Sequence, residues 1–134
     1  MNSITFSKKF LAGVVSLAAG FAFAGAAQAD GWPADVSGSW SIIANQVGST
    51  MVLTQGAAGA GSQCLPIHGT VFGDTLEGFY CPGSGRIAFK RNVSLQTYVG
   101  NLSQSGTATR MGGTWLSLGG SFGEYEFYAQ KVLR

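Results

Sequence analysis

Residues 37–55, SGSWSIIANQVGSTMVLTQ, carry the pattern that decides the fold. Trp40, Ile42 and Ala44 occupy alternate positions, and a second apolar run follows the polar segment that contains Gly48. Period-two alternation interrupted by a polar, glycine-containing segment is typical of a β-hairpin. The stretch therefore predicts two antiparallel strands joined by a short turn.

The rest of the chain repeats this design of short alternating strands and glycine-marked turns. Six further strands are predicted over residues 65–72, 75–81, 85–92, 95–103, 107–118 and 122–132. Because these segments lack a helical period and their connections are short, strands that are neighbours in sequence must be antiparallel. Eight such strands close best into a barrel, since closure removes the exposed edges.

The predicted fold class is thus all-β, an eight-stranded antiparallel up-and-down β-barrel over residues 36–132, with the first strand paired to the last. A sandwich is the alternative, but a Greek key needs a long crossover that this chain does not offer. Residues 30–36 are expected to form a short leader, with Trp32 covering one end of the barrel. GAAGAGSQ at residues 56–63 is expected to be an exposed loop.

The start of the chain has the parts of a secretory signal. Lys8 and Lys9 precede an uncharged apolar run over residues 10–25, which is followed by the small-x-small sequence AQA. A membrane anchor is the alternative, but the run leads directly into this cleavage pattern. We therefore predict a signal peptide over residues 1–29 and a single barrel domain over residues 30–134. The domain is expected to be secreted or periplasmic, with no membrane segment after signal removal.

The charge of the predicted domain excludes some classes of partner. Residues 30–134 hold six basic and six acidic side chains, so the formal charge of +2 of the whole chain comes from Lys8 and Lys9. No basic stripe is present, and neither nucleic acid nor an anionic membrane has an electrostatic footprint here. Low charge with abundant Gly, Ser and Thr suits an all-β domain.

Cys64 and Cys81 are predicted to form a disulfide. They flank the strand pair around Gly73-Asp74, and pairing residues whose numbers sum to 145 places the two cysteines directly opposite each other. A two-residue turn at Gly73-Asp74 favours a sum of 147 instead, so both registers stay open. Export into an oxidising compartment favours the bond, which should stabilise the fold by roughly 3 kcal/mol.

The sequence does not predict an enzyme, a metal site or a cofactor. His68 is the only histidine, and neither a nucleophile motif nor a recognised metal-ligand spacing accompanies it. We expect a half-buried or surface histidine instead. The candidate carboxylates for an acid–base pair lie in a turn or on outward strand faces: Asp74, Glu77, Glu124 and Glu126.

Four segments resemble the avidin/streptavidin family. GSW at residues 38–40 and NQVGST at 45–50 are similar to the family's first hairpin, TYVG at 97–100 to its sixth strand, and RMGGTWL at 110–116 to its seventh. The resemblance follows the strand order through most of the predicted domain. G-x-W openings recur also in lipocalins and in periplasmic protease-inhibitor barrels. The resemblance implies an avidin/calycin-like barrel.

The resemblance implies a ligand site at the barrel end that carries the turn of residues 45–49. Asn45 and Ser49 match the residues that hydrogen-bond the ureido oxygen of biotin. Trp115 matches a Trp that packs on the ligand, and Ser94 lies where a Ser would meet its sulfur or carboxylate region. The implied ligand-binding residues are Asn45, Ser49, Phe89, Ser94, Trp115 and Tyr125.

Several positions depart from the family's biotin site. Val71 stands where a ureido-binding Tyr is expected, Phe89 replaces a pocket Trp, and Gln96 replaces a Thr. Tyr125 falls near the position of a ureido-binding Asp. The turn between the third and fourth strands is too tight for the family's lid, and the short loop at 119–121 has no counterpart of the Trp that a neighbouring subunit supplies. Since buried urea recognition needs several polar partners, we expect weak or absent biotin binding.

The sequence therefore predicts an exported, non-catalytic β-barrel that binds a small, biotin-like ligand. The alternative is a secreted or periplasmic protein-binding barrel such as a hydrolase inhibitor, in which Asn45 and Ser49 are ordinary turn residues. A hollow lumen lined by these two residues and Trp115 would favour the ligand, and a packed lumen the partner protein. A homo-oligomer is open under either function, as is glycosylation of Asn92 and Asn101.

Overall fold

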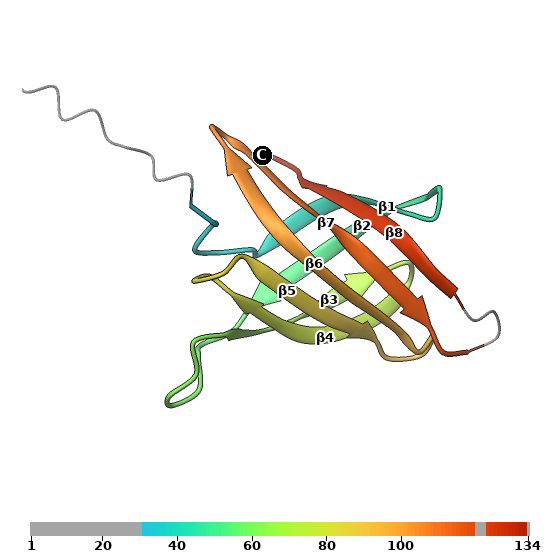
Figure 1. Ribbon diagram of the computed structural model, residues 1–134, viewed down its shortest axis with the longest axis horizontal. Coiled ribbons are helices and arrows are strands. Elements are labelled where there is room, and N and C mark those ends of the chain that lie inside the picture. The colour runs from blue at the N-terminus through green and yellow to red at the C-terminus, as the bar shows by residue number, and fades with distance from the viewer. Residues whose placement is uncertain (1–30, 120–122, 134) are drawn as a thin grey trace, which may run out of the picture.

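The computed structural model describes residues 31–119 and 123–133, and the predicted signal peptide lies outside these residues. The chain forms one closed barrel of eight strands (Figure 1). The strands are β1 (Gly38–Ala44), β2 (Val47–Gln55), β3 (Leu65–Val71), β4 (Asp74–Cys81), β5 (Arg86–Arg91), β6 (Gln96–Ser105), β7 (Ala108–Ser117) and β8 (Gly123–Lys131). Each strand is antiparallel to the next, and β8 closes the barrel by pairing with β1. The predicted all-β, eight-stranded up-and-down barrel is confirmed.

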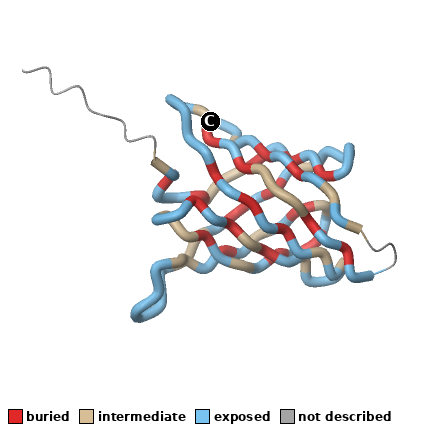
Figure 2. Tube along the Cα trace, in the orientation of Figure 1, coloured by how far each residue is buried: buried red, intermediate tan, exposed pale blue. Residues whose placement is uncertain are grey.

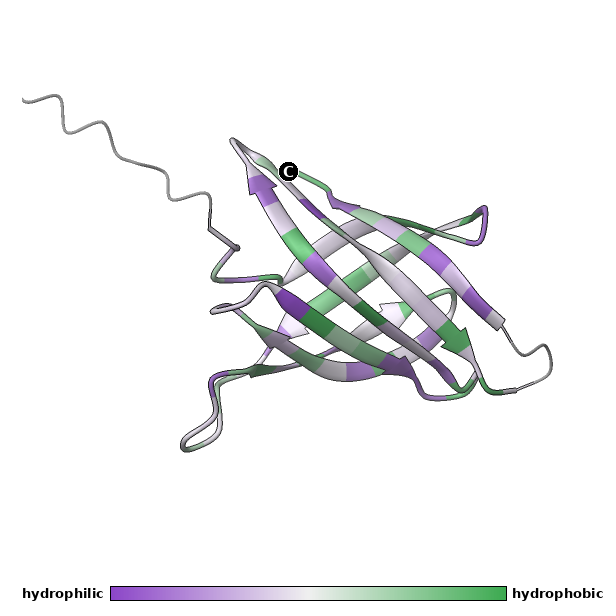
Figure 3. Ribbon diagram, viewed as in Figure 1, coloured by the Kyte–Doolittle hydropathy of each residue, from purple (hydrophilic) through white to green (hydrophobic). Residues whose placement is uncertain are grey.

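Buried and exposed residues alternate along the strands (Figure 2), and hydropathy alternates with them (Figure 3). In β1 the side chains of Trp40, Ile42 and Ala44 are buried, as the period-two pattern of this segment requires. The lumen is packed with large apolar side chains and contains no helix. Its largest fully buried members are Trp40, Tyr80, Tyr98, Ile42, Met51 and Leu53. Across the described ranges, no helix is long and apolar enough to span a membrane.

The turn between β3 and β4 differs from the predicted Gly73-Asp74 by one residue. Phe72 and Gly73 occupy the turn, with φ angles of 51° and 73°, and Asp74 begins β4 opposite Val71. Positive φ at both central residues is the geometry of a tight hairpin turn, although a Phe in this conformation is uncommon. Leu65 therefore pairs with Tyr80, so the numbers of paired residues sum to 145. In this register Cys64, just before β3, lies opposite Cys81 at the end of β4. Contacts of Asp74 with the next turn favour this register, as described below.

The leader closes the end of the barrel that carries the disulfide, at the left in Figure 1. Val36 is fully buried there, and its carbonyl oxygen accepts a hydrogen bond of 3.0 Å from Trp40 Nε1. The Tyr80 hydroxyl donates a hydrogen bond of 2.6 Å to the Pro33 carbonyl oxygen, and burial raises the pKa of Tyr80 to about 12. Trp32 is half-exposed and lies against Gly85 at the rim, so Val36 fills this end and Trp32 only borders it.

Cys64 and Cys81 are joined, as predicted, across a sequence separation of 17 residues. Removing the bond in the double variant Cys64→Ser/Cys81→Ser is expected to lower the free energy of unfolding by about 3 kcal/mol, because the unfolded chain regains the entropy of the opened ring. Denaturant unfolding of the variant and of the oxidised protein measures this difference. Equal midpoints for the two proteins would contradict the expectation.

Candidate functional site

The barrel end opposite the leader holds a pocket, which we name the mouth pocket. The β1–β2, β3–β4 and β5–β6 turns gather at this end, at the right in Figure 1. The pocket has a volume of about 200 Å³. It is lined by Ala44, Asn45, Val47, Phe72, Arg91, Gln96, Tyr98 and Trp115. One end of the barrel is thus filled by the chain's own leader, and the other offers a concave surface.

Four aromatic side chains form a continuous row beneath and beside the pocket, on adjacent strands β5 to β8. Phe89 pairs with Tyr98, Tyr98 with Trp115, and Trp115 with Tyr125 in the sheet register. Their rings stack with centroid distances of 4.7, 5.7 and 4.6 Å in that order. Phe127 meets both Phe89 and Tyr98 edge-on. This packing fills the lumen below the pocket, so a ligand can reach only the mouth of the barrel.

Among the described residues, Arg91 supplies the only charged side chain in the pocket lining. Its Nη1 donates a hydrogen bond of 2.7 Å to Gln96 Oε1, and its Nη2 a longer one of 3.4 Å to the Phe72 carbonyl oxygen. The guanidinium carbon lies 5.3 Å from the centre of the Phe72 ring, within cation–π range. Gln96 Oε1 also accepts a hydrogen bond of 3.0 Å from the Tyr98 hydroxyl. Burial raises the pKa of Tyr98, although Arg91 opposes this shift, so the hydroxyl is a neutral donor.

Asp74 ties the β3–β4 turn to the β5–β6 turn beside the pocket. Its Oδ2 accepts hydrogen bonds from Val93 N, Ser94 N and Ser94 Oγ, at 3.2, 3.1 and 3.2 Å. Arg91 Nε lies 3.5 Å from the same oxygen, and both side chains are largely buried. Burial raises the pKa of Asp74, but the Ser94 and Val93 donors and the Arg91 charge together lower it below its usual value. These contacts explain why β4 begins at Asp74.

The lowered pKa of Asp74 predicts an acid-dependent loss of stability. The contribution of this carboxylate is complete above the unfolded-state pKa of about 3.9 and disappears as the pH falls through the lower folded-state value. The melting temperature of Asp74→Asn should therefore lie below that of the wild type at neutral pH, with the gap narrowing as the pH falls below about 4. Thermal unfolding between neutral and acidic pH measures this.

Asp35 is the matched control at the leader end, because Ser37 donors lower its pKa as well. Asp35→Asn should also make the melting temperature less dependent on pH, but it should leave the mouth pocket undisturbed. A constant gap between Asp74→Asn and the wild type at all pH values would contradict the assignment for Asp74.

The structure brings two of the predicted ligand-binding residues into the mouth pocket, Asn45 and Trp115. Asn45 lies at positive φ in the β1–β2 turn, and its backbone N–H donates to the Glu126 carbonyl oxygen. Trp115 is largely buried, and its Nε1 is without a hydrogen-bond partner among the described residues. Phe89 and Tyr125 reach the site only through the aromatic row.

The two predicted serines are engaged with the protein itself. Ser49 Oγ accepts a hydrogen bond of 3.3 Å from Phe72 N and donates one of 3.3 Å to the Thr50 carbonyl oxygen. The Ser94 hydroxyl donates to Asp74. Neither serine lines the mouth pocket. Their ligand-binding roles stay predictions, and their observed contacts are those of turn residues.

Arg91, Phe72 and Tyr98 line the pocket but are not among the ligand-binding residues predicted from the sequence. A signal for Arg91 was present, because it follows the inward-facing Ile87 and Phe89 at two-residue intervals. A charged residue at a lumen-facing position of a barrel strand needs a partner or a function. Phe72 had no such signal, since it was assigned to the end of a strand.

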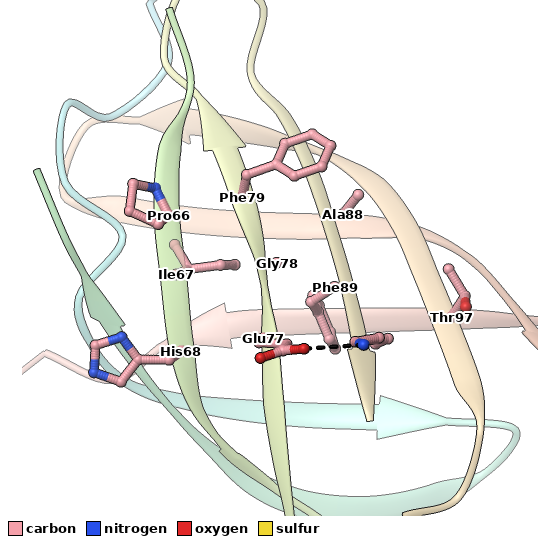
Figure 4. A pocket seen from close by; sticks show the side chains of 10 residues that line it. Pro66, Ile67, His68, Glu77, Gly78, Phe79, Ala88, Phe89 and Thr97 are labelled. Atoms are coloured by element: carbon pink, nitrogen blue, oxygen red, sulfur yellow. Dashed lines mark ion pairs between the residues drawn. The ribbon is translucent and has the colours of Figure 1, made fainter. Parts of the chain in front are cut away.

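The outer surface carries a larger hollow of about 640 Å³ across β3, β4, β5 and β6 (Figure 4). Figure 4 shows Pro66, Phe79 and Ala88 around it, with the Glu77–Lys90 ion pair at its edge. His68 is exposed at this surface, away from the mouth pocket. Within the described parts of the chain, no group of three or more His, Cys, Asp or Glu side chains could hold a metal ion.

Comparison with known protein families, curated proteins and solved structures finds no match to this chain. The closed, eight-stranded antiparallel barrel is consistent with an avidin-like fold. The buried aromatic row and the mouth pocket are the features of this barrel that bear on its function.

Proposed function

We propose that this protein is an exported, non-catalytic binding protein that takes a small ligand in the mouth pocket. The observation that carries the proposal is the asymmetry of the barrel. The leader plugs one end with Val36, whereas the other end leaves aromatic, amide and guanidinium groups around a cavity of about 200 Å³. Small barrels are suited to hold one small ligand at such a site.

The size of the mouth pocket limits the ligand. Pockets for drug-sized molecules usually measure about 300–1,000 Å³, and this one is smaller, at about 200 Å³. The aromatic row forms the floor, so the ligand cannot enter more deeply without displacing buried rings. A single planar ring, or the end of a longer molecule, fits these limits.

The chemistry around the pocket favours binding over catalysis. His68, the only histidine, is exposed on the outer face of β3 and lies outside the pocket lining. Asp74, the carboxylate that contacts Arg91, is held ionised by its hydrogen-bond donors and by the Arg91 charge. The disulfide is typical of an oxidising, extracytoplasmic compartment, which supports export.

We expect biotin to bind weakly or not at all. Of the residues that the avidin-like pattern assigns to a ligand, Asn45 and Trp115 line the pocket, while the Ser49 and Ser94 hydroxyls already bond within the protein. Losing two hydrogen bonds to a buried ligand at about 1.5 kcal/mol each weakens binding by roughly a hundredfold or more. Calorimetric titration of the protein lacking residues 1–29 with biotin tests this.

The variants Asn45→Ala and Trp115→Phe locate any binding that is found. Micromolar binding that both variants weaken would support a biotin-like ligand in the mouth pocket. Trp32→Phe, at the leader end, is the matched tryptophan control and should leave binding unchanged. A nanomolar constant would contradict the expectation of weak binding.

A protein-binding barrel, such as a hydrolase inhibitor, is the second candidate function. It is supported by the packed lumen, which is the arrangement expected for a barrel that binds a partner protein. It is also supported by the exposed apolar side chains around the mouth, on the turns and strand ends: Val47, Val93, Leu95 and Leu118. Exposed apolar patches of this kind often mark interaction sites. Val93→Ser/Leu95→Ser should reduce inhibition of a susceptible hydrolase while leaving small-ligand binding intact. If the double variant instead retains inhibition and loses small-ligand binding, the mouth pocket is favoured as the functional site.

A further inference from the structure

We propose that the mouth pocket recognises the carboxylate of a small aromatic acid, with Arg91 as the anchor. This inference rests on the proposed small-ligand function and names the class of ligand. It depends on three observations at one site: a largely buried arginine with unused donors, a lining of stacked aromatic rings, and a buried indole N–H without a partner among the described residues.

Arg91 retains donor capacity after its contacts within the protein. Each terminal nitrogen of a guanidinium carries two N–H groups. Nη1 has one acceptor, Gln96 Oε1, and Nη2 has one, the Phe72 carbonyl oxygen, among the described residues. One N–H on each nitrogen therefore has no acceptor among the described residues. A guanidinium with two such N–H groups can donate to both oxygens of a carboxylate.

Asp74 does not take up this capacity. It approaches Arg91 through Nε, at 3.5 Å, and the contact lacks hydrogen-bond geometry. The carboxylate oxygens of Asp74 are instead occupied by the N–H groups of Val93 and Ser94 and by the Ser94 hydroxyl. Asp74 compensates part of the positive charge and holds the guanidinium in place, while the terminal nitrogens are left for an external anion.

The immobilised guanidinium lowers the entropic cost of binding an anion. Only 13% of the Arg91 side chain is exposed, and the Phe72 ring and Gln96 hold it on two sides. A charge-assisted hydrogen bond is stronger in such a poorly solvated site than at an exposed surface. An exposed arginine would have to be ordered for each binding event, and Arg91 is ordered in advance.

The rings of Tyr98 and Trp115 give the pocket an aromatic, apolar side. Both line the pocket, and they stack with an interplanar angle of 19°, so their faces point toward each other and their edges border the cavity beside the guanidinium. Trp115 Nε1 is buried without a partner among the described residues, so its N–H is an unmet donor. An aromatic acid would place its ring against these ring edges and its carboxylate on Arg91.

A purely structural role for Arg91, as a link between the turns, is the competing explanation. The two explanations differ in how the site treats charge. A structural arginine gives no preference between a carboxylate and an amide of the same shape, whereas an anchoring arginine favours the carboxylate. Benzoate and benzamide form such a pair, and benzoate is ionised at neutral pH.

The test is a titration of the protein lacking residues 1–29 with benzoate and with benzamide at pH 7, followed by amide and indole NMR shifts. We expect benzoate to bind with a dissociation constant on the order of a millimolar, typical of a one-ring ligand, and benzamide at least about tenfold more weakly. The Trp115 indole signal should move with benzoate.

Two variants locate the preference. Arg91→Met should reduce benzoate binding to the level of benzamide. Arg91→Lys should retain only part of the benzoate binding, because an ammonium lacks the paired N–H donors of a guanidinium. Arg86→Met is the matched control, since Arg86 lies on the same strand but is exposed on the outer face. Melting curves verify that the variants are folded, and the comparison of the two ligands on the wild type decides the question without any variant.

Each outcome supports or overturns the inference. Equal affinity for the two ligands would overturn carboxylate recognition while leaving small-ligand binding at the mouth intact. Shifts confined to the outer hollow around Phe79 would overturn it as well. If neither benzoate, benzamide nor biotin moves the Trp115 signal, the inference and the proposed function both fail.

Discussion

Gly113→Ala is expected to lower the free energy of unfolding by at least about 3 kcal/mol, whereas the adjacent Gly112→Ala should change it by less than about 1 kcal/mol. A β-carbon at position 113 would lie 2.1 Å from the Val99 carbonyl oxygen and 2.5 Å from the Gly100 α-carbon. Both are backbone atoms of the paired strand β6, so β6 and β7 would have to separate.

The neighbouring position provides the matched control. A β-carbon at position 112 meets only the Phe127 carbonyl oxygen, at 3.6 Å, which is an ordinary van der Waals distance. Gly112→Ala also removes conformational freedom from the unfolded chain, which offsets part of any cost. Denaturant unfolding with the disulfide intact compares the two variants. Similar losses at both positions would show that the close approach of β6 and β7 does not limit stability.

Gly113 belongs to a set of glycines that let the strands bend closely around the lumen. At three other positions a β-carbon would lie within 1.8 to 2.5 Å of a neighbouring strand's carbonyl oxygen: Gly69, Gly78 and Gly100. Glycine inside a strand often marks such a bend or close backbone approach. The glycine content that sequence analysis read as turn signals therefore has a second role in closing a small barrel.

The fold was predictable because barrel strands depend on a local pattern. Alternation in segments such as Trp40 to Ala44 depends only on which side chains face the core, and this gave the strand number, order and pairing. The turn at Phe72-Gly73 was misplaced by one residue because a Phe at positive φ has no local signal. Its position depends on Asp74, whose partners lie about twenty residues away along the chain.

The candidate site was predicted only in part. Asn45 and Trp115 were found because they stand in segments that resemble a known family. The leader was expected to cover one end of the barrel, but Trp32 was named in place of Val36. The contacts that decide this join residues far apart in sequence, such as Tyr80 and Pro33, which are 47 residues apart. The role of Arg91 likewise depends on Phe72 and Gln96, which only the folded barrel brings around one guanidinium.

The second large effect on stability is expected at Trp40, which packs in the lumen and holds the leader. Trp40→Ala should lower the free energy of unfolding by about 3–5 kcal/mol, because a fully buried tryptophan leaves a large cavity in the lumen. The same change removes the donor to the Val36 carbonyl oxygen and so loosens the plug. Trp40→Phe, which retains most of the apolar contact, should lose about 1–2 kcal/mol from the missing hydrogen bond and smaller ring.

Trp32→Ala is the control at the same end of the barrel. Trp32 is 46% exposed, so its removal should lower the free energy of unfolding by less than about 1 kcal/mol. The mouth pocket lies at the opposite end, and ligand shifts at the Trp115 indole should be the same in Trp40→Phe as in the wild type. Denaturant unfolding measures the stabilities, and the benzoate titration measures the site. A loss of binding in Trp40→Phe would mean that the two ends of the barrel are coupled through the packed lumen.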